Sequence, residues 1–284
     1  MPVRVAVFGS LNHDITLTVP HMPSGDETLR ATGYAEFCGG KGFNQAVAAA
    51  RLGASSEMIG CVGQDAPGAM LVGALTHNHV GHRFVSRVEE HTGTALITTD
   101  ANDVTIVLVT GANGALDSHH ADAARDVLEH VDVLLLQGEV SHQAAARAAQ
   151  IVRDAGGLVV FSPAPVSPDS ALVLPMASFV VANRGEAAAL GLVPGDNVVI
   201  TQGAAGTRVK DLLVPVFPAQ VVDPTGAGDA FTAAFGVALA EGADIVEAVR
   251  FGSAAGSWAV RTLGAEPSLP TRADIASVLA EGGR

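Results

Sequence analysis

The chain has 284 residues, a length that one large α/β domain can account for, and its formal net charge at pH 7 is −13. This acidic balance argues against nucleic acid or an anionic membrane as a partner, because such binding neutralises phosphates with Lys and Arg. The two cysteines form neither a CxxC pair nor a metal pattern, so no disulfide framework is expected. The first apolar run is too short for a signal peptide and no stretch reaches membrane-span length, which predicts a cytoplasmic protein.

The first half of the chain opens on a buried strand and then mixes strands with helices. Apolar runs and alternating patterns predict strands at 3–8, 16–19, 29–37, 56–62, 94–99 and 104–110. Helical spacing predicts helices at 44–52 and 67–78, the first ended by Gly53 and the second begun with a proline in its first turn. The sequence "DAND" predicts a hairpin turn between the last two strands.

The second half alternates buried strands with helices more regularly. Predicted helices lie at 121–129, 141–155, 227–240, 245–260 and 272–280, and predicted strands at 133–137, 158–161, 179–182 and 198–201, with a small strand pair within 208–222. This alternation predicts a doubly wound, mainly parallel sheet flanked by helices in a single domain over residues 1–284. The pieces at about 14–38 and 83–111 alternate polar and apolar residues, so we expect them to form a small separate β-sheet lid.

The motif "GSLNHD" directly follows the first strand. In open α/β sheets, ligands bind beyond the carboxyl ends of strands. Asn12 and Asp14 are two residues apart, so in extended backbone they face the same side. An amide and a carboxylate on one side suit a polyhydroxylated ligand. The alternative is an ordinary turn stabilised by these side chains.

The motif "CGGKGFNQA" combines glycines with Lys41, one of only two lysines in the chain. The glycines allow close approach to the backbone, and Asn44 stands where a helix begins. Asn44 could equally be an N-cap in a plain loop. Lys41 is followed by Gly42 rather than Ser or Thr, so this is not a Walker A motif, and no GxGxxG follows the first strand.

The motif "VVDPTGAGDAF" places three small residues, Gly226, Ala227 and Gly228, directly before Asp229 at the start of a predicted helix. Backbone N–H groups at a helix N-terminus bind anions. Asp229 could accept a proton from an attacking hydroxyl, and the two features together suit phosphoryl transfer. The alternative is an acid placed in a first turn because the helix dipole favours it there.

Weaker candidates follow other strands. Asn183 and Glu186 in "NRGE" offer an amide and a carboxylate that could hold Mg²⁺ through water, and Thr201 opens the glycine-rich turn "TQGAAG". Glu139 also stands just past the end of a strand. Alone, clusters of this kind more often only mark loops. The histidines show neither HxxxH nor HExxH spacing, so no metal site built on them is expected.

Taken together, these motifs resemble those of the ribokinase-like, or PfkB, family of sugar kinases. "GGKGFNQAVAAARLGA" is similar to the N-terminal signature of the family and "DPTGAGDAF" to its C-terminal signature. Between and around them, "GSLNHD", "QGEV", "NRGE", "TQGAAG" and "RTLGAEPSLP" stand in the family order, and the resemblance extends to Pro270. The sugar-site residues resemble most closely those of members that phosphorylate ribose. The resemblance implies ATP-dependent phosphorylation of a primary hydroxyl, with D-ribose as the first expectation.

The resemblance also implies site residues. The matching sugar-site positions are Asn12, Asp14, Gly40, Lys41, Asn44, Glu139 and Asp229. Asp229 would be the base, and Gly226, Ala227 and Gly228 would form the anion hole for the transferred phosphoryl group. ATP with its Mg²⁺ would be held by Asn183, Glu186, Thr201, Gly203, Gly206, Gly228 and Ser253. The ligands of a monovalent cation, K⁺, would fall on Asp223, Thr225, Ala259, Thr262, Gly264 and Ser268.

Two departures from the family pattern affect these expectations. The segment "AAALGLVPGDN" after Glu186 is short, so one flanking helix could be missing and an apolar surface exposed on the nucleotide side. Pro224 replaces the Thr of many relatives, and because it fixes φ before the glycine turn we expect the loop to survive. The lid also resembles the dimer clasp of the family, which implies a homodimer. The alternatives are fructose, 2-keto-3-deoxygluconate or a nucleoside as acceptor, or a catalytically silent sugar or nucleotide sensor.

Overall fold

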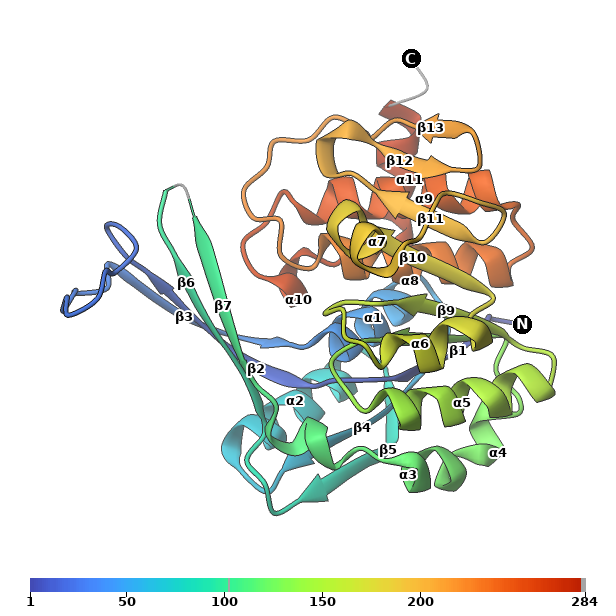
Figure 1. The fold of residues 1–284 in the computed structure, drawn as a ribbon, viewed down its shortest axis with the longest axis horizontal. Helices are drawn as coiled ribbons and strands as arrows, with labels where there is room; N and C mark the ends of the chain where they lie inside the picture. The colour runs from blue at the N-terminus through green and yellow to red at the C-terminus, as the bar shows by residue number, and fades with distance from the viewer. Residues whose placement is uncertain (102, 282–284) are drawn as a thin grey trace.

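The computed structural model describes residues 1–101 and 103–281. Within them, the body of the protein is built on a nine-stranded sheet (Figure 1). Its strands, in spatial order, are β13 (Leu212–Val214), β12 (Thr207–Val209), β11 (Val198–Thr201), β10 (Phe179–Asn183), β9 (Leu158–Ser162), β8 (Val133–Gln137), β1 (Arg4–Phe8), β4 (Ser55–Gly63) and β5 (Gly81–Val88). Pairing is parallel from β5 to β11 and antiparallel only for β12 and β13. The predicted doubly wound, mainly parallel sheet is confirmed.

Helices cover both faces of this sheet. On one face lie α1 (Lys41–Arg51), α2 (Ala66–His77), α8 (Ala227–Ala240), α9 (Ile245–Ala259) and α11 (Arg272–Glu281). On the other lie α3 (Ser118–Ala123), α4 (Arg125–Leu128), α5 (His142–Asp154), α6 (Ser170–Val173) and α7 (Arg184–Leu190). Val5 and Val7 of β1 pack on the first layer, and Ala6 and Phe8 on the second. Strands buried on both faces read as unbroken apolar runs, which is why the sequence reveals them.

A second sheet of four strands forms the lid. Its order is β3 (Gly33–Gly39), β2 (Asn12–Thr18), β6 (Gly93–Thr99) and β7 (Val104–Val109), and it projects from one side of the body (Figure 1). Part of the second predicted lid piece, from 83 to 88, belongs instead to β5, because these residues pair with β4 in the large sheet. The predicted turn between β6 and β7 includes residue 102, which lies outside the described residues.

Several predicted boundaries shift in ways that affect the site. Strand β2 already begins at Asn12, so "NHD" is extended backbone rather than a turn. Helix α1 begins at Lys41 with Gly40 as its N-cap, which places Asn44 inside the helix rather than at its cap. In the described chain no helix stands between α7 and β11, and Val193 in this connection is 73% exposed. Leu192 beside it packs partly buried against the core, so Val193 is the one exposed large apolar side chain among the described residues of this connection.

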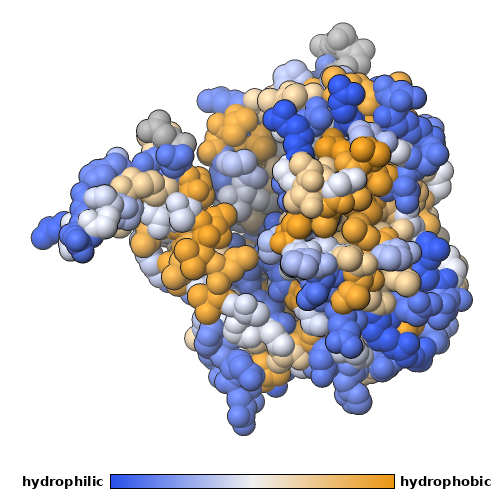
Figure 2. All heavy atoms as spheres, viewed as in Figure 1, coloured by the Kyte–Doolittle hydropathy of each residue, from blue (hydrophilic) through white to orange (hydrophobic). Residues whose placement is uncertain are grey.

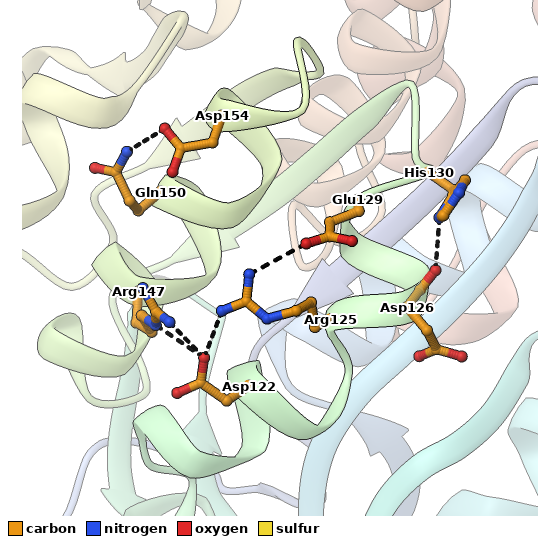
Figure 3. Close-up of polar contacts among 8 residues, drawn as sticks. All are labelled: Asp122, Arg125, Asp126, Glu129, His130, Arg147, Gln150 and Asp154. Carbon is orange, nitrogen blue, oxygen red and sulfur yellow. Dashed lines mark hydrogen bonds and ion pairs between the residues drawn. The ribbon is translucent and has the colours of Figure 1, made fainter.

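Short elements complete the described chain: the helix α10 (Ala265–Ser268) beside β3, and the 3-10 segments Gly111–Ala115, Leu174–Met176 and Gly203–Ala205. None of the described helices has both the length and the apolar character needed to cross a bilayer. On the surface formed by α3, α4 and α5, Asp122 accepts hydrogen bonds from Arg125 and Arg147 (Figure 3). Exposed ion pairs of this kind contribute at most about 1 kcal/mol each.

Candidate active site

The largest group of predicted site residues meets in one cavity between the lid and the carboxyl ends of the parallel strands. Figure 2 shows the hollow between the projecting lid and the body. The cavity has a volume of about 390 Å³. Every residue expected for the sugar site lines it, namely Asn12, Asp14, Gly40, Lys41, Asn44, Glu139 and Asp229. Residues far apart in sequence converge here because β1, α1, β8 and α8 meet at the carboxyl ends of the parallel strands.

Asn12 and Asp14 enter the cavity from alternate positions of β2, as their spacing predicts. Asn12 is 5% exposed, and its side-chain Oδ1 accepts a hydrogen bond of 2.7 Å from Asn113 Nδ2. Asp14 is similarly enclosed, and its Oδ1 has no partner among the described residues. Burial, together with the charges of Glu139 and Asp229, raises the pKa of Asp14 to about 7, although Lys41 opposes this rise. A buried, unpaired acceptor of this kind costs free energy unless a ligand donates to it.

Lys41 is the cation among these carboxylates. Burial by itself would lower the pKa of the Lys41 ammonium, but the charges of Asp229, Glu139, Glu186 and Asp14 raise it above its usual range. Glu139 is fixed from the side of the loop after β1: its Oε2 accepts a hydrogen bond of 2.5 Å from Ser10 Oγ and one of 3.2 Å from the backbone N–H of Lys41. Because Lys41 lines the cavity, its charged side chain can meet a polar ligand there.

Asp229 lies in the first turn of α8 and is 7% exposed. Gly226, the N-cap, has φ 81°, a left-handed conformation that glycine adopts without strain. Two amides of α1 hold the carboxylate: Asn44 Nδ2 donates to its Oδ2 at 2.9 Å, and Gln45 Nε2 donates to its Oδ1 at 3.0 Å. Asn44 Oδ1 is buried without a partner among the described residues. The cavity thus contains an oriented carboxylate beside an amide oxygen that can still accept a donor.

The small residues before Asp229 border two cavities. Gly226 and Gly228 line the cavity under the lid, whereas Ala227 and Gly228 line a neighbouring one. The first N–H groups of a helix have no partner inside the helix, and its dipole favours an anion there. Of these groups, the N–H of Ala227 donates at 3.2 Å to the carbonyl of Pro224. Pro224 therefore closes the turn through its carbonyl, and the loop forms despite the missing proline N–H.

The neighbouring cavity has a volume of about 490 Å³ and a mostly apolar wall that includes Phe217, Phe231 and Val260. Thr201, Gly203, Gly206, Gly228 and Ser253, all expected on the nucleotide side, line it. Thr201 and Gly228 also line the first cavity, so the two adjoin at these residues. Ser253 is 4% exposed, and its hydroxyl has no partner among the described residues. An apolar slot with one unpaired hydroxyl can take a flat heterocycle with a polar edge.

Asn183 and Glu186 line the first cavity but also cap α7. Asn183 Oδ1 accepts from the backbone N–H of Glu186 at 2.9 Å, and Glu186 Oε2 accepts from the N–H of Asn183 at 2.8 Å. Burial raises the pKa of Glu186, and the Asp229 charge adds to this, while Asn183 and Lys41 lower it. In the described chain no three His, Cys, Asp or Glu side chains gather as a metal site. The amide and carboxylate that these two residues bring to the cavity fit Mg²⁺ held on a nucleotide through water, which suits a cation that dehydrates reluctantly.

Of the residues expected around a monovalent cation, only Thr225 lines either cavity, and five of the six form hydrogen bonds among themselves. Asp223 Oδ1 accepts from Thr225 Oγ1 at 2.6 Å, and its Oδ2 accepts from the N–H of Gly264 at 2.8 Å. The N–H of Thr262 donates to the carbonyl of Ala259 at 3.4 Å, and Ser268 Oγ donates to the carbonyl of Ala265 at 2.7 Å. A fixed carboxylate beside turns rich in carbonyls is a donor set that fits a hard cation.

The structure adds residues that the sequence did not single out. The inner face of the lid contributes apolar side chains to the first cavity: Ala95, Ile97, Val104, Ile106 and Leu108. Period-two alternation in β6 and β7 could have identified this face. Asn113, which orients Asn12, and Gln45, which contacts Asp229, carried no sequence signal. Their roles depend on which side chains the fold brings next to them.

Comparison with known proteins identifies the relatives of the chain. The sequence profile described as pfkB family carbohydrate kinase matches residues 3–272. The ribokinase of Bacillus subtilis is 36% identical over 291 residues, covering 97% of this chain and 99% of that protein. The ribokinase structure from Thermotoga maritima superposes with a TM-score of 0.88 at 32% identity, and that of Arabidopsis thaliana ribokinase, complexed with ribose and ATP, with 0.88 at 30%. Both alignments cover 98% of this chain and 99% of the other. The chain belongs to the pfkB family of carbohydrate kinases.

Proposed function

We propose that this protein is an ATP-dependent kinase that phosphorylates the primary hydroxyl of D-ribose. The observation that carries the proposal is the pairing of two adjoining cavities across the first turn of α8. One contains buried polar groups with unpaired acceptors, Asp14 Oδ1 and Asn44 Oδ1, and the other is mainly apolar with the Ser253 hydroxyl. A polyhydroxylated acceptor suits the first and a nucleobase the second. The ribokinase names of the relatives, and the ribose and ATP of the Arabidopsis complex, support this choice of substrates.

In this proposal, the residues expected at the sugar site and in the anion hole have defined tasks. Asn12, Asp14, Gly40, Lys41, Asn44 and Glu139 bind the sugar and orient it with its primary hydroxyl at Asp229. Asp229 accepts the hydroxyl proton as the oxygen forms its bond to the γ-phosphorus, and the bond from that phosphorus to the bridging oxygen of ADP breaks. The N–H groups of Gly226, Ala227 and Gly228 stabilise the charge of the transferred group. The Ala227 N–H exchanges its bond to Pro224 for one to the phosphoryl oxygen.

Two cations complete the proposed site. Asn183 and Glu186 hold Mg²⁺ through water, and the ion, when bound, neutralises phosphate charge. A monovalent cation, K⁺, is held near Asp223 and Thr225, with Ala259, Thr262, Gly264 and Ser268 as the further ligands. When bound, its positive charge would add to the field that favours an anion at this turn. Removal of K⁺ from the assay is expected to lower kcat, and an unchanged rate in K⁺-free buffer would exclude this second cation.

A coupled assay that follows ADP release tests the proposed activity. Ribose, fructose, 2-keto-3-deoxygluconate and a nucleoside are each supplied with MgATP, and ribose is expected to give the highest kcat/KM. A higher value with another acceptor would reassign the substrate. ADP release that depends on none of these acceptors would contradict the proposed sugar-kinase function of this chain.

We also propose that the outer face of the lid joins two copies of the chain. Leu17, Tyr34, Leu96, Val107 and Val109 lie on the side of the lid opposite the cavity and are 37–63% exposed. An apolar sheet face of this kind is costly to leave in water. A homodimer is therefore expected by sedimentation at micromolar concentration, and Leu96→Lys combined with Val107→Lys is expected to give a monomer. A monomeric wild type at this concentration would exclude the dimer.

A further inference from the structure

A chain of two buried glutamines lies behind Asp229. Gln137 Nε2 donates a hydrogen bond of 2.7 Å to Gln45 Oε1, and Gln45 Nε2 donates one of 3.0 Å to Asp229 Oδ1. Gln45 is 0% exposed and Gln137 is 1% exposed. Neither lines a cavity described above, so neither side chain reaches a ligand there. Whatever they contribute to the reaction must act through Asp229.

The direction of the two hydrogen bonds is fixed by chemistry. Asp229 as a carboxylate can only accept, so Gln45 must turn its NH₂ group toward it. That orientation points Gln45 Oε1 at Gln137, which supplies the donor that this oxygen needs. The two amide dipoles therefore align with their positive ends toward the carboxylate. Gln137 Oε1, at the far end, has no partner among the described residues, so this alignment is retained although it leaves one buried acceptor unpaired.

The surroundings of Asp229 explain why such donors are needed. Glu186, Glu139, Asp14 and Asp229 all contribute to the field at Lys41, so four carboxylates share a small volume with one lysine. Asp14, which is about as buried as Asp229, has an unpaired oxygen, and its pKa is raised to about 7. Asp229 differs in accepting an amide donor on each oxygen. Donors on both oxygens hold this carboxylate in one orientation.

We propose that Gln45, held in turn by Gln137, is a positioning residue that keeps the Asp229 carboxylate aimed at the acceptor hydroxyl. This inference rests on the proposed kinase function and extends it to residues outside the two cavities. Asn44 lines the cavity and can exchange its contact for one to the sugar. Gln45 has no such access and therefore holds Asp229 whether or not the sugar is bound.

The first test replaces Gln45 with Met, which keeps the length of the side chain but removes both polar atoms. The loss of a hydrogen bond to a charged group predicts a fall in kcat of about 10- to 100-fold at pH 7. Ribose affinity, measured by calorimetry without ATP, is expected to change by less than about threefold.

Gln137→Met provides the second test without touching Asp229 or its neighbours in the cavity. Gln45 then loses the donor that fixes its orientation, so kcat is expected to fall by about 3- to 10-fold. The double variant is expected to lose no more activity than Gln45→Met alone, since Gln137 acts only through Gln45. This non-additivity is not expected of two independent packing defects.

Gln150→Met is the matched control. Gln150 Nε2 donates to Asp154 Oδ1 at 2.6 Å on the surface of α5, so it makes the same type of contact away from both cavities (Figure 3). Its kcat is expected to stay at the wild-type value. Folded Gln45→Met and Gln137→Met variants with the wild-type kcat would overturn the inference. If Gln45→Met does not fold, the kcat of Gln137→Met decides alone. A wild type inactive with every acceptor would instead contradict the proposed function.

Discussion

Asn113 Nδ2 donates a hydrogen bond of 2.7 Å to Asn12 Oδ1, and this contact decides which end of the Asn12 amide faces the cavity. Asn113 is itself fixed, because its Oδ1 accepts from the N–H of Leu11 at 2.9 Å and its Nδ2 also donates to the Leu11 carbonyl. With Asn12 Oδ1 occupied, its NH₂ group is the part left for the cavity. Asn12 is thereby oriented as a donor toward a sugar oxygen.

This orientation predicts the effect of Asn113→Asp. The carboxylate introduced by this substitution can only accept, so the Asn12 amide has to turn its NH₂ group toward it and present its oxygen to the sugar. The ribose KM is expected to rise by about 10-fold or more, with kcat within about threefold of wild type, because a ground-state contact is lost. Steady-state kinetics with ribose measure both values. An unchanged KM would mean that Asn12 does not donate to the sugar.

Asp229→Asn tests the proposed base while keeping the shape of the side chain. The amide cannot take up the hydroxyl proton, so kcat is expected to fall by about 10²- to 10⁴-fold. Sugar affinity measured by calorimetry is expected to stay within about tenfold, because the other polar groups of the cavity remain. A variant that retains wild-type turnover would show that Asp229 is not the base.

The raised pKa of Asp14 predicts that sugar binding depends on pH. With a pKa of about 7, Asp14 is mostly protonated at pH 6 and mostly ionised at pH 8. Only the ionised form accepts hydroxyl donors on both oxygens, so ribose is expected to bind about tenfold more tightly at pH 8 than at pH 6. Calorimetry without ATP measures this directly. Asp14→Asn is expected to bind weakly with no such dependence, and a wild-type affinity that is constant over this range would contradict the prediction.

The same pKa predicts a cost in stability. The folded-state pKa of about 7 lies above the ordinary value of 3.8, so the folded protein loses stability as pH rises from about 4 to 7 and gains none back above it. Asp14→Asn removes this cost. At pH 8 the variant is expected to be more stable by on the order of 4 kcal/mol, with the gain vanishing toward pH 4. Denaturant unfolding at the two pH values tests this, and equal stabilities at pH 8 would rule it out.

Ser253→Ala tests the nucleotide side. The Ser253 hydroxyl is buried in the apolar cavity without a partner among the described residues, so a nucleotide is the expected one. Loss of one neutral hydrogen bond predicts a rise in the KM for ATP of about 3- to 10-fold, with the ribose KM unchanged. Should the KM for ATP instead remain at its wild-type value, the hydroxyl has no role in nucleotide binding.

Much of this fold can be read from the sequence, because its strands and helices carry strong patterns. The apolar run of β1 and the helical spacing of α8 predict their elements almost to the residue. Residues near strand ends are harder to place. Asn12 belongs to β2 because β2 pairs along its length with β3 and β6, a long-range contact that no local pattern records. Residues 83–88 join β5 for the same reason, since the adjacent strand β4 is available to pair with them.

The sequence by itself determined the parallel core and the polar residues that follow its strands. Strands buried on two faces are unbroken apolar runs, and the polar residues directly after these runs show where the strands end. Only the tertiary structure decided which atoms of those residues form hydrogen bonds and which are left without a partner. Asn44 Nδ2 and Gln45 Nε2 both meet Asp229, while Asp14 Oδ1 is left unpaired. Such pairings depend on how α1, β2 and α8 pack together at the carboxyl ends of the parallel strands. Asn44 and Gln45 are adjacent amides that the sequence does not distinguish. The packing of these elements places Asn44 at the cavity and Gln45 behind Asp229.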